Sequence, residues 1–276
     1  MINEVVHLKD HYPFLGENGC DPTLTIYIPT CHFDRGLPDR IRPAILICPG
    51  GGYHFVSRRE AEPVGLKFLN DGYNIFILKY SVKPSTFPTA IREVAAAMEL
   101  IHKNAENWLT DVTRIAIMGF SAGGHLACHY SNCYNIPEVR EVFPDSKPVQ
   151  AAILSYPVIT ADPKYRHSGS FINLSGHEQI TEEDIEKFSL ENRVTENTPP
   201  TFLWHTRTDQ LVPVMNSLLY AQALADAGVP FAVHIYPKGG HGLSTADHVT
   251  NDSLGVGSPH AADWIDAAKK WLSIVF

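Results

Sequence analysis

Short apolar runs alternate along this chain with longer segments that have helical periodicity. Residues 44–48, Ala-Ile-Leu-Ile-Cys, form a continuous apolar run that ends abruptly at a proline and three glycines. Continuous apolar runs without polar alternation are typical of strands covered on both faces of a sheet. Together with turn residues between such runs, the pattern predicts strands at residues 5–8, 24–28, 44–48, 74–78, 115–118, 151–154, 201–204 and 231–235.

Helical periodicity fills most of the intervals between these strands. The clearest helical segment, residues 88–107, repeats apolar side chains at Ile91, Val94, Met98 and Ile101. Further helices are expected at about 60–70, from near Ala122 onward, at 216–227 and at about 261–275. Alternating strands and helices predict a mostly parallel central sheet with helices on both faces, a three-layer α/β sandwich. We therefore expect a single α/β domain spanning residues 1–276.

One segment departs from this alternation. Residues 158–198 are rich in polar groups and contain a single short helical candidate, residues 182–187. A loop longer than about 15 residues inside a compact domain is usually functional or disordered. We expect an excursion over the edge of the sheet, either a lid or a plain surface insertion.

Composition and charge exclude several classes of protein. The 276 residues are 44% hydrophobic, and 22 Lys+Arg against 30 Asp+Glu give a net charge of −8. An acidic chain without a basic stretch argues against nucleic acid or an anionic membrane surface as a partner. No apolar run approaches the roughly 18 residues that a membrane helix needs. The residue types that begin the chain do not resemble a secretory signal.

Cysteine usage points to a reducing compartment. The count is odd and no pair has CxxC spacing, so neither a disulfide framework nor a zinc site is expected. These cysteines are Cys20, Cys31, Cys48, Cys128 and Cys133. We expect a cytoplasmic protein without a metal, and the sequence leaves its oligomeric state open.

The most specific chemical signal is Gly119-Phe120-Ser121-Ala122-Gly123, which lies between a predicted strand and a predicted helix. A G-x-S-x-G pattern in this context forms a sharp strand-to-helix turn that raises the serine hydroxyl above the sheet. The glycines matter because side chains there would collide with neighbouring backbone. Ser121 is therefore the candidate nucleophile, and an ordinary turn is the alternative interpretation.

A serine nucleophile needs a base that is itself oriented by a third group. The chain has 14 histidines, so position has to decide among them. His241 follows the strand predicted at 231–235, and Asp209 follows the strand at 201–204, so both belong at the carboxyl edge of the sheet. The order Ser121, Asp209, His241 is the order expected of this type of site.

Competing residues have less favourable positions. His125 lies four residues beyond the serine on the predicted helix and is expected to pack against the sheet. His205 and His234 lie in or beside strands, where buried, hydrogen-bonded histidines are expected. His54 follows the glycine run and is a candidate to line the pocket. Asp162 is the alternative acid.

The run Pro49-Gly50-Gly51-Gly52-Tyr53 supplies a third element. Attack on a carbonyl places negative charge on its oxygen, which aimed backbone N–H groups stabilise. We expect the N–H groups of Gly51, Gly52 and Ala122 to form this oxyanion hole. A phosphate-binding loop is the rival interpretation, but no Lys-Ser/Thr follows the glycines and the G-x-G-x-x-G spacing is absent.

Four segments together resemble the α/β-hydrolase superfamily, and within it the small esterase/lipase branch that includes acetyl-xylan-esterase-like sugar esterases. They are residues 48–53, 119–127, 209–214 and 240–242. The resemblance implies the α/β-hydrolase fold, with Ser121 as nucleophile, Asp209 as acid, His241 as base and the oxyanion amides named above. Many relatives have histidine before the glycines, where this chain has Pro49.

The resemblance implies a serine carboxylic-ester hydrolase that needs no cofactor. The expected substrate is a small ester, an acylated sugar or small xylo-oligosaccharide that loses a short acyl group such as acetyl. Tyr53, Tyr156, Leu211 and Leu243 flank the catalytic loops and either narrow the acyl pocket or belong to the core and rim. The alternatives are a serine peptidase of the acylpeptide-hydrolase type and an inactive binding protein of the same fold.

Overall fold

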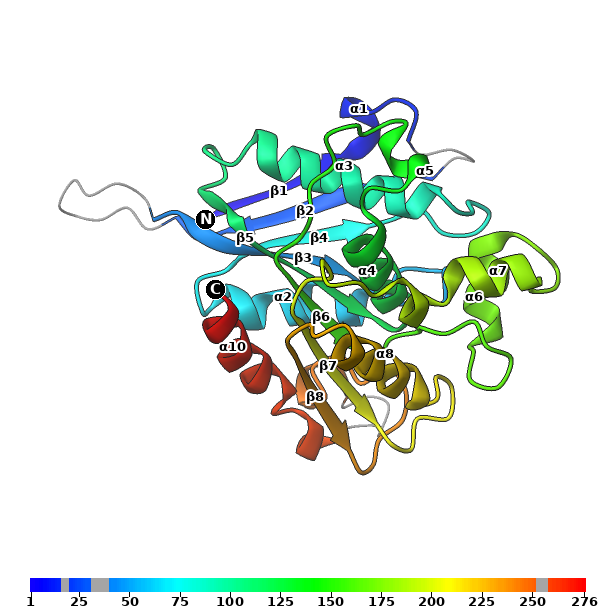
Figure 1. Cartoon of the computed structure of the whole chain (residues 1–276). Coiled ribbons are helices and arrows are strands. Elements are labelled where there is room, and N and C mark those ends of the chain that lie inside the picture. The colour runs from blue at the N-terminus through cyan, green and yellow to red at the C-terminus, as the bar shows by residue number, and fades with distance from the viewer. Residues whose placement is uncertain (16–19, 31–39, 252–257) are drawn as a thin grey trace.

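A single eight-stranded sheet runs through the protein (Figure 1). The computed structural model describes residues 1–15, 20–30, 40–251 and 258–276. The strands are β1 (Ile2–His7), β2 (Thr23–Ile28), β3 (Arg42–Cys48), β4 (Asn74–Lys79), β5 (Thr110–Phe120), β6 (Ala151–Ser155), β7 (Thr201–Thr206) and β8 (Phe231–Tyr236). Each strand predicted from the sequence is present and overlaps its predicted range.

The strand order across the sheet is β1-β2-β4-β3-β5-β6-β7-β8. β1 pairs antiparallel with β2, and β2 pairs antiparallel with β4. From β4 to β8 every neighbouring pair is parallel. The prediction of a mostly parallel sheet is confirmed, and the carboxyl ends of six strands meet at one edge.

Helices cover both faces of this sheet and form two separate cores. On one face lie α3 (Thr89–Lys103), α4 (Ser121–Cys133) and α8 (Met215–Asp226), and on the other lie α2 (Glu62–Leu69) and α10 (Trp264–Val275). Successive side chains of a strand point to opposite faces. Accordingly, Ile115 and Ile117 of β5 belong to the first core, while Ala116 and Met118 belong to the second. The three-layer sandwich is confirmed.

Short helices complete the described residues. They are α1 (Leu8–His11), α5 (Pro137–Arg140) and α9 (His248–Asn251), with 3-10 turns η2 (Arg58–Glu60), η3 (Leu190–Arg193) and η5 (Pro259–Ala261). The helix expected at 88–107 ends at Lys103, where the side chain of Asn104 bonds back to the Leu100 carbonyl. The final helix begins at Trp264, after η5, rather than at residue 261.

The segment 158–198 contains more helix than the sequence suggested. α7 (Glu182–Phe188) matches the short helix expected there and begins with a capping box between Thr181 and Asp184. α6 (Ser168–Ser175) was not predicted, because its Ser-Gly-Ser-Phe-Ile-Asn-Leu-Ser sequence has few strong helix formers. Its buried side chains, Phe171 and Leu174, join the first core. Tertiary packing therefore stabilises this helix.

Two further observations bear on the sequence predictions. Cys20, Cys48, Cys128 and Cys133 are free thiols, and Cys31 lies outside the described residues. Within those residues, no helix has both the length and the apolar character required to cross a bilayer.

Candidate active site

A sharp turn between β5 and α4 presents Ser121. Its backbone has a φ of 53°, a left-handed conformation that non-glycine residues rarely adopt. A Cβ at Gly119 would lie 2.2 Å from the Gly123 carbonyl oxygen, and one at Gly123 would lie 2.2 Å from the Cys48 carbonyl oxygen. Both positions therefore require glycine, as expected of a turn that raises the serine above the sheet.

The structure brings Ser121, His241 and Asp209 into one chain of contacts. Nε2 of His241 lies 2.7 Å from Ser121 Oγ, and its Nδ1 lies 2.6 Å from Asp209 Oδ2. An ionised carboxylate only accepts hydrogen bonds, so the hydrogen of a neutral imidazole resides on Nδ1. Nε2 is then free to accept the serine hydroxyl. This is the arrangement of nucleophile, base and orienting acid that general-base activation requires.

Asp209 is fully buried and surrounded by donors. The N–H groups of Leu211 and Val212 donate to Oδ1 at 2.9 and 3.0 Å, and Nε2 of His205 lies 3.3 Å from Oδ2. Burial by itself raises the pKa of this carboxyl, but hydrogen bonds from His205 and His241 outweigh it and hold the pKa below its ordinary value. Asp209 thus stays ionised beside His241.

The other candidate residues from the sequence lie elsewhere or have other partners. Asp162 is exposed, and its carboxylate accepts the N–H of Lys164. His125 is fully buried and bonds the Phe188 carbonyl through Nε2, so its Nδ1 accepts the Tyr53 hydroxyl at 2.9 Å. The prediction that His205 is buried and hydrogen-bonded is confirmed, and His125 is buried as expected. The same prediction for His234 was wrong, because β8 is an edge strand: His234 is only half-buried, and its ring stacks on that of Phe202 at 4.9 Å between centroids.

The glycine run after β3 forms a tight loop above Ser121. Gly51 and Gly52 have φ values of 129° and 64°, and a Cβ at Gly51 would lie 1.9 Å from the Phe55 carbonyl oxygen. In the part of the chain that the structure describes, the N–H groups of Gly51, Gly52 and Ala122 have no protein acceptor. Unpartnered, rigidly held N–H groups are what an oxyanion hole requires.

A cavity of about 310 Å³ opens in front of Ser121 and His241. Its walls also include His54, His167, Asn173 and Leu211. The excursion 158–198 therefore contributes a wall of this cavity through α6 and the residue that precedes it.

Of the four residues predicted as candidate substrate contacts, Leu211 lines the cavity and is half-exposed. Tyr53, Tyr156 and Leu243 are buried, and none of the three belongs to the cavity wall. The ring of Tyr156 packs edge-on against that of His241, with 5.1 Å between their centroids. These three residues support the site from behind.

The sequence analysis missed a buried carboxylate, Glu60, at the centre of this support. Its Oε2 accepts the N–H of Gly50 at 2.9 Å, and its Oε1 accepts the Tyr156 hydroxyl at 2.7 Å. The Tyr156 oxygen in turn accepts the N–H of Ser244, three residues beyond His241. One carboxylate thus connects the glycine loop to the loop of the histidine. No local motif marks Glu60, because its two partners, Gly50 and Tyr156, come from two separate segments.

α6 supplies two further residues that no sequence pattern indicated. The side-chain amide of Asn173 donates to the Gly52 carbonyl at 2.9 Å, which fixes the glycine loop from the opposite side. Nδ1 of His167 lies 2.8 Å from Ser170 Oγ. Burial and the nearby His241 lower the pKa of His167, which favours its neutral form in the cavity wall. Among the described residues, no group of three or more His, Cys, Asp and Glu side chains is arranged to hold a metal.

This sheet order, with a serine turn after β5 and a histidine loop after β8, defines an esterase-like protein of the α/β-hydrolase superfamily. Residues 26–224 match the BD-FAE family, and the chain belongs to that family.

Known proteins support this placement. The chain is 36% identical over 255 residues to endo-1,4-beta-xylanase B of Butyrivibrio fibrisolvens, covering 89% of this chain and 38% of that protein. It is 33% identical over 204 residues to an acetylxylan esterase of Xylanibacter ruminicola, covering 72% of this chain and 41% of that protein. The chain thus spans about two fifths of the length of these curated relatives.

One solved structure aligns with this protein over nearly the full length of both chains. The acetyl ester-xyloside bifunctional hydrolase of Caldicellulosiruptor lactoaceticus superposes with a TM-score of 0.82 at 33% identity, covering 99% of this chain and 96% of that one. The structural similarity therefore extends beyond residues 26–224, which match the family, to nearly the whole chain.

Proposed function

We propose that this protein is a serine carboxylic ester hydrolase that removes short acyl groups, acetyl foremost, from sugars or small xylo-oligosaccharides. The observation that carries the proposal is the contact chain from Ser121 Oγ through His241 to Asp209, at 2.7 and 2.6 Å. The names of an acetylxylan esterase and an acetyl ester-xyloside hydrolase among its relatives support the substrate class.

The reaction proceeds through an acyl-enzyme. Nε2 of His241 removes the proton of Ser121 as Oγ attacks the ester carbonyl carbon, and the carbonyl oxygen becomes an oxyanion. When the oxyanion collapses, the carbon–oxygen bond to the alcohol breaks and His241 returns the proton to the departing alcohol. Water then attacks the acyl carbonyl with the same base, which releases the acid and restores Ser121.

The negative charge on the oxyanion is stabilised by the free N–H groups of Ala122 and of the glycine loop. Removing a single donor of this kind from an enzyme typically lowers the rate about 10²- to 10³-fold. Gly51 and Gly52 supply donors from one side, and Ala122 supplies another from the start of α4. Glu60 and Asn173 are positioning residues, because they hold this loop by its Gly50 N–H and its Gly52 carbonyl.

Asp209 orients the base and stabilises the imidazolium that forms during attack. Its lowered pKa keeps the Asp209 carboxyl ionised at neutral pH. Leu211, next to the acid and on the cavity wall, limits the space for the acyl group. We therefore expect hydrolysis rates to fall from acetate to octanoate esters, and a rise along that series would overturn the short-acyl assignment.

Replacement of the nucleophile tests the central proposal. Ser121→Ala is expected to abolish hydrolysis of 4-nitrophenyl acetate and labelling by a fluorophosphonate probe. The matched control is Ser131→Ala on the same helix, where the hydroxyl donates to the Ala127 carbonyl. Near-wild-type turnover by Ser121→Ala would refute the assignment. An acylated amino-acid amide in the same assay tests the acylpeptide-hydrolase alternative.

A further inference from the structure

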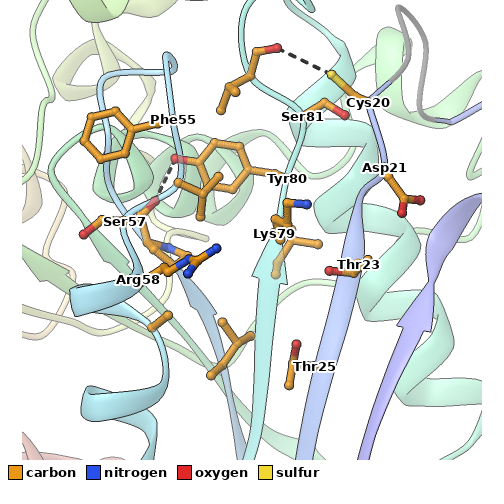
Figure 2. A pocket seen from close by; sticks show the side chains of 16 residues that line it. Cys20, Asp21, Thr23, Thr25, Phe55, Ser57, Arg58, Lys79, Tyr80 and Ser81 are labelled. Atoms are coloured by element: carbon orange, nitrogen blue, oxygen red, sulfur yellow. Dashed lines mark hydrogen bonds between the residues drawn. The ribbon is translucent and has the colours of Figure 1, made fainter.

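A second and larger cavity lies beside the candidate active site. It has a volume of about 620 Å³ and opens at the antiparallel side of the sheet, against β2, β4 and the turn that leads into η2 (Figure 2). Phe55 and Ser57 line both cavities. The segment from Phe55 to Ser57 therefore separates the two cavities. The η2 turn that follows places Glu60 at the active site and Arg58 at the second cavity.

Two cationic side chains line this second cavity. The guanidinium of Arg58 and the ammonium of Lys79 both extend into it (Figure 2). Within the described ranges neither side chain forms an ion pair. The presence of two cations in one cavity contrasts with the net charge of the whole chain, which is −8.

The nearby carboxylates are already engaged. Asp21 is the sole acid in the described lining, and it pairs with His7 at 2.9 Å and Lys9 at 3.0 Å. Glu62, close to Arg58 on the next helix, accepts the Tyr27 hydroxyl at 2.9 Å. The two cations are therefore available to an anionic group that enters from solvent.

The rest of the lining fits a sugar. Hydroxyl groups come from Thr23, Thr25 and Ser57, and the Phe55 ring stands 58% exposed at the rim between the two cavities. Hydroxyls exchange hydrogen bonds with a saccharide, while an exposed aromatic ring offers an apolar face to pack against the C–H face of a sugar ring. A volume of this size falls within the usual range of ligand pockets.

We propose that the second cavity binds a carboxylate-bearing sugar, a uronic acid unit, in the alcohol part of the ester substrate. This proposal rests on the proposed ester hydrolase function. Ser121 lines the first cavity and not the second, and Phe55 and Ser57 lie between them, so we assign the second cavity to the alcohol part of the ester and not to a short acyl group on Ser121. Arg58 offers a planar fork that matches a carboxylate, and Lys79 adds a point charge.

The expected effect is moderate because both cations are exposed to solvent. Exposed ion pairs are weak and are screened by salt. We expect the wild-type kcat/KM for an acetylated xylo-oligosaccharide carrying a glucuronosyl unit to exceed that for the neutral counterpart about tenfold at low salt. The ratio should shrink as the salt concentration rises.

The test is the double variant Arg58→Gln/Lys79→Gln. It should remove the preference for the acidic substrate and leave hydrolysis of the neutral oligosaccharide and of 4-nitrophenyl acetate unchanged. Lys270→Gln, a lysine on the exposed side of α10, is the matched control and should keep the preference. Each single variant is expected to reduce the preference for the acidic substrate about threefold. The single variants keep the proposal testable if the double variant does not fold.

Calorimetric titration of the Ser121→Ala variant separates the two proposals. Tighter binding of the glucuronosyl oligosaccharide than of the neutral one, lost on adding Arg58→Gln/Lys79→Gln, supports the second cavity. Equal binding and equal hydrolysis of the two oligosaccharides would overturn it, while the neutral acetate assay still reports on the ester hydrolase. The acyl side is tested with 4-nitrophenyl hemisuccinate, whose acyl group carries a carboxylate. If the enzyme prefers this ester to 4-nitrophenyl acetate and loses that preference in Arg58→Gln/Lys79→Gln, the two cations recognise the acyl group, and the proposal for the alcohol part is overturned.

Discussion

Two walls of the active-site cavity differ in how they are built. The triad wall presents Ser121 and His241 to the cavity, with Asp209 buried behind His241, and these residues follow β5, β8 and β7 at the carboxyl edge of the sheet. The loop wall consists of residues 50–60 and α6, and it carries the amides proposed for the oxyanion.

The triad wall depends on direct side-chain contacts of 2.6 and 2.7 Å between groups that the strand order already places together. The loop wall depends on indirect support: Glu60 holds Gly50, and Asn173 holds Gly52 from 121 residues away. The topology of the sheet thus sets the positions of the three proposed catalytic side chains, whereas the alignment of the proposed oxyanion amides depends on packing between separate segments.

The largest effect should come from the acid of the triad wall. Asp209→Asn keeps the shape but replaces the carboxylate with an amide, which favours the wrong tautomer of His241. In the serine protease template this change costs about 10⁴ in kcat, and we expect a loss of similar order here. Steady-state kinetics on 4-nitrophenyl acetate measures it. Asp162→Asn is the control, and a loss there as large as at Asp209 would contradict the assignment.

A smaller loss is expected from the loop wall. Glu60→Gln presents one acceptor oxygen where Glu60 uses two, so either the Gly50 N–H or the Tyr156 hydroxyl loses its acceptor. We expect kcat to fall about 10- to 100-fold with KM little changed, because the amides act on the transition state.

Glu62→Gln is the matched control for Glu60, since Glu62 also accepts a tyrosine hydroxyl but lies outside the active-site cavity. A KM effect at Glu60 with kcat intact would show that this carboxylate serves substrate binding instead of loop alignment.

The contribution of α6 should be smaller again. Asn173→Ala removes the hydrogen bond to the Gly52 carbonyl and should lower kcat about tenfold or less, because Glu60 still holds the loop. Asn192→Ala, an exposed asparagine later in the same excursion, is the control. Full activity of Asn173→Ala would mean that α6 lines the cavity without supporting the loop.

A buried carboxylate outside the active-site cavity, Glu93 on α3, should alter stability more than catalysis. Burial raises the pKa of Glu93 to about 7, against the opposing effect of two hydrogen bonds from Ser81. Between pH 4.5 and 7 the folded state then keeps a proton that the unfolded state releases, so stability falls as the pH rises. A shift from 4.5 to about 7 corresponds to about 3 kcal/mol in the free energy of unfolding.

Glu93→Gln should therefore flatten the dependence of thermal stability on pH over this range. The measurement is the midpoint of thermal unfolding between pH 4.5 and 7.5, with the exposed Glu196→Gln as control. An unchanged slope in Glu93→Gln would show that the carboxyl does not hold its proton in the fold.

The sequence by itself determined the sheet, the two covered faces and the residues that the structure brings together at the triad wall. Apolar runs mark the strands, of which inner ones such as β6 and β7 are buried on both faces, and parallel strands place Ser121, Asp209 and His241 at one edge. The need for glycine at positions 119 and 123 can also be predicted from the sequence motif. A Cβ at either position would lie 2.2 Å from a backbone oxygen of the turn or of the adjacent strand.

Tertiary structure alone decided the rest. α6 has weak intrinsic helix propensity and forms through the burial of Phe171 and Leu174. Glu60 and Asn173 act through hydrogen bonds to residues that are distant in the sequence, and no local sequence pattern predicts such contacts. Tyr53 and Tyr156 lie near the catalytic loops in sequence, yet packing turns both rings inward. The second cavity likewise exists only where β2, β4 and the turn before η2 meet in space.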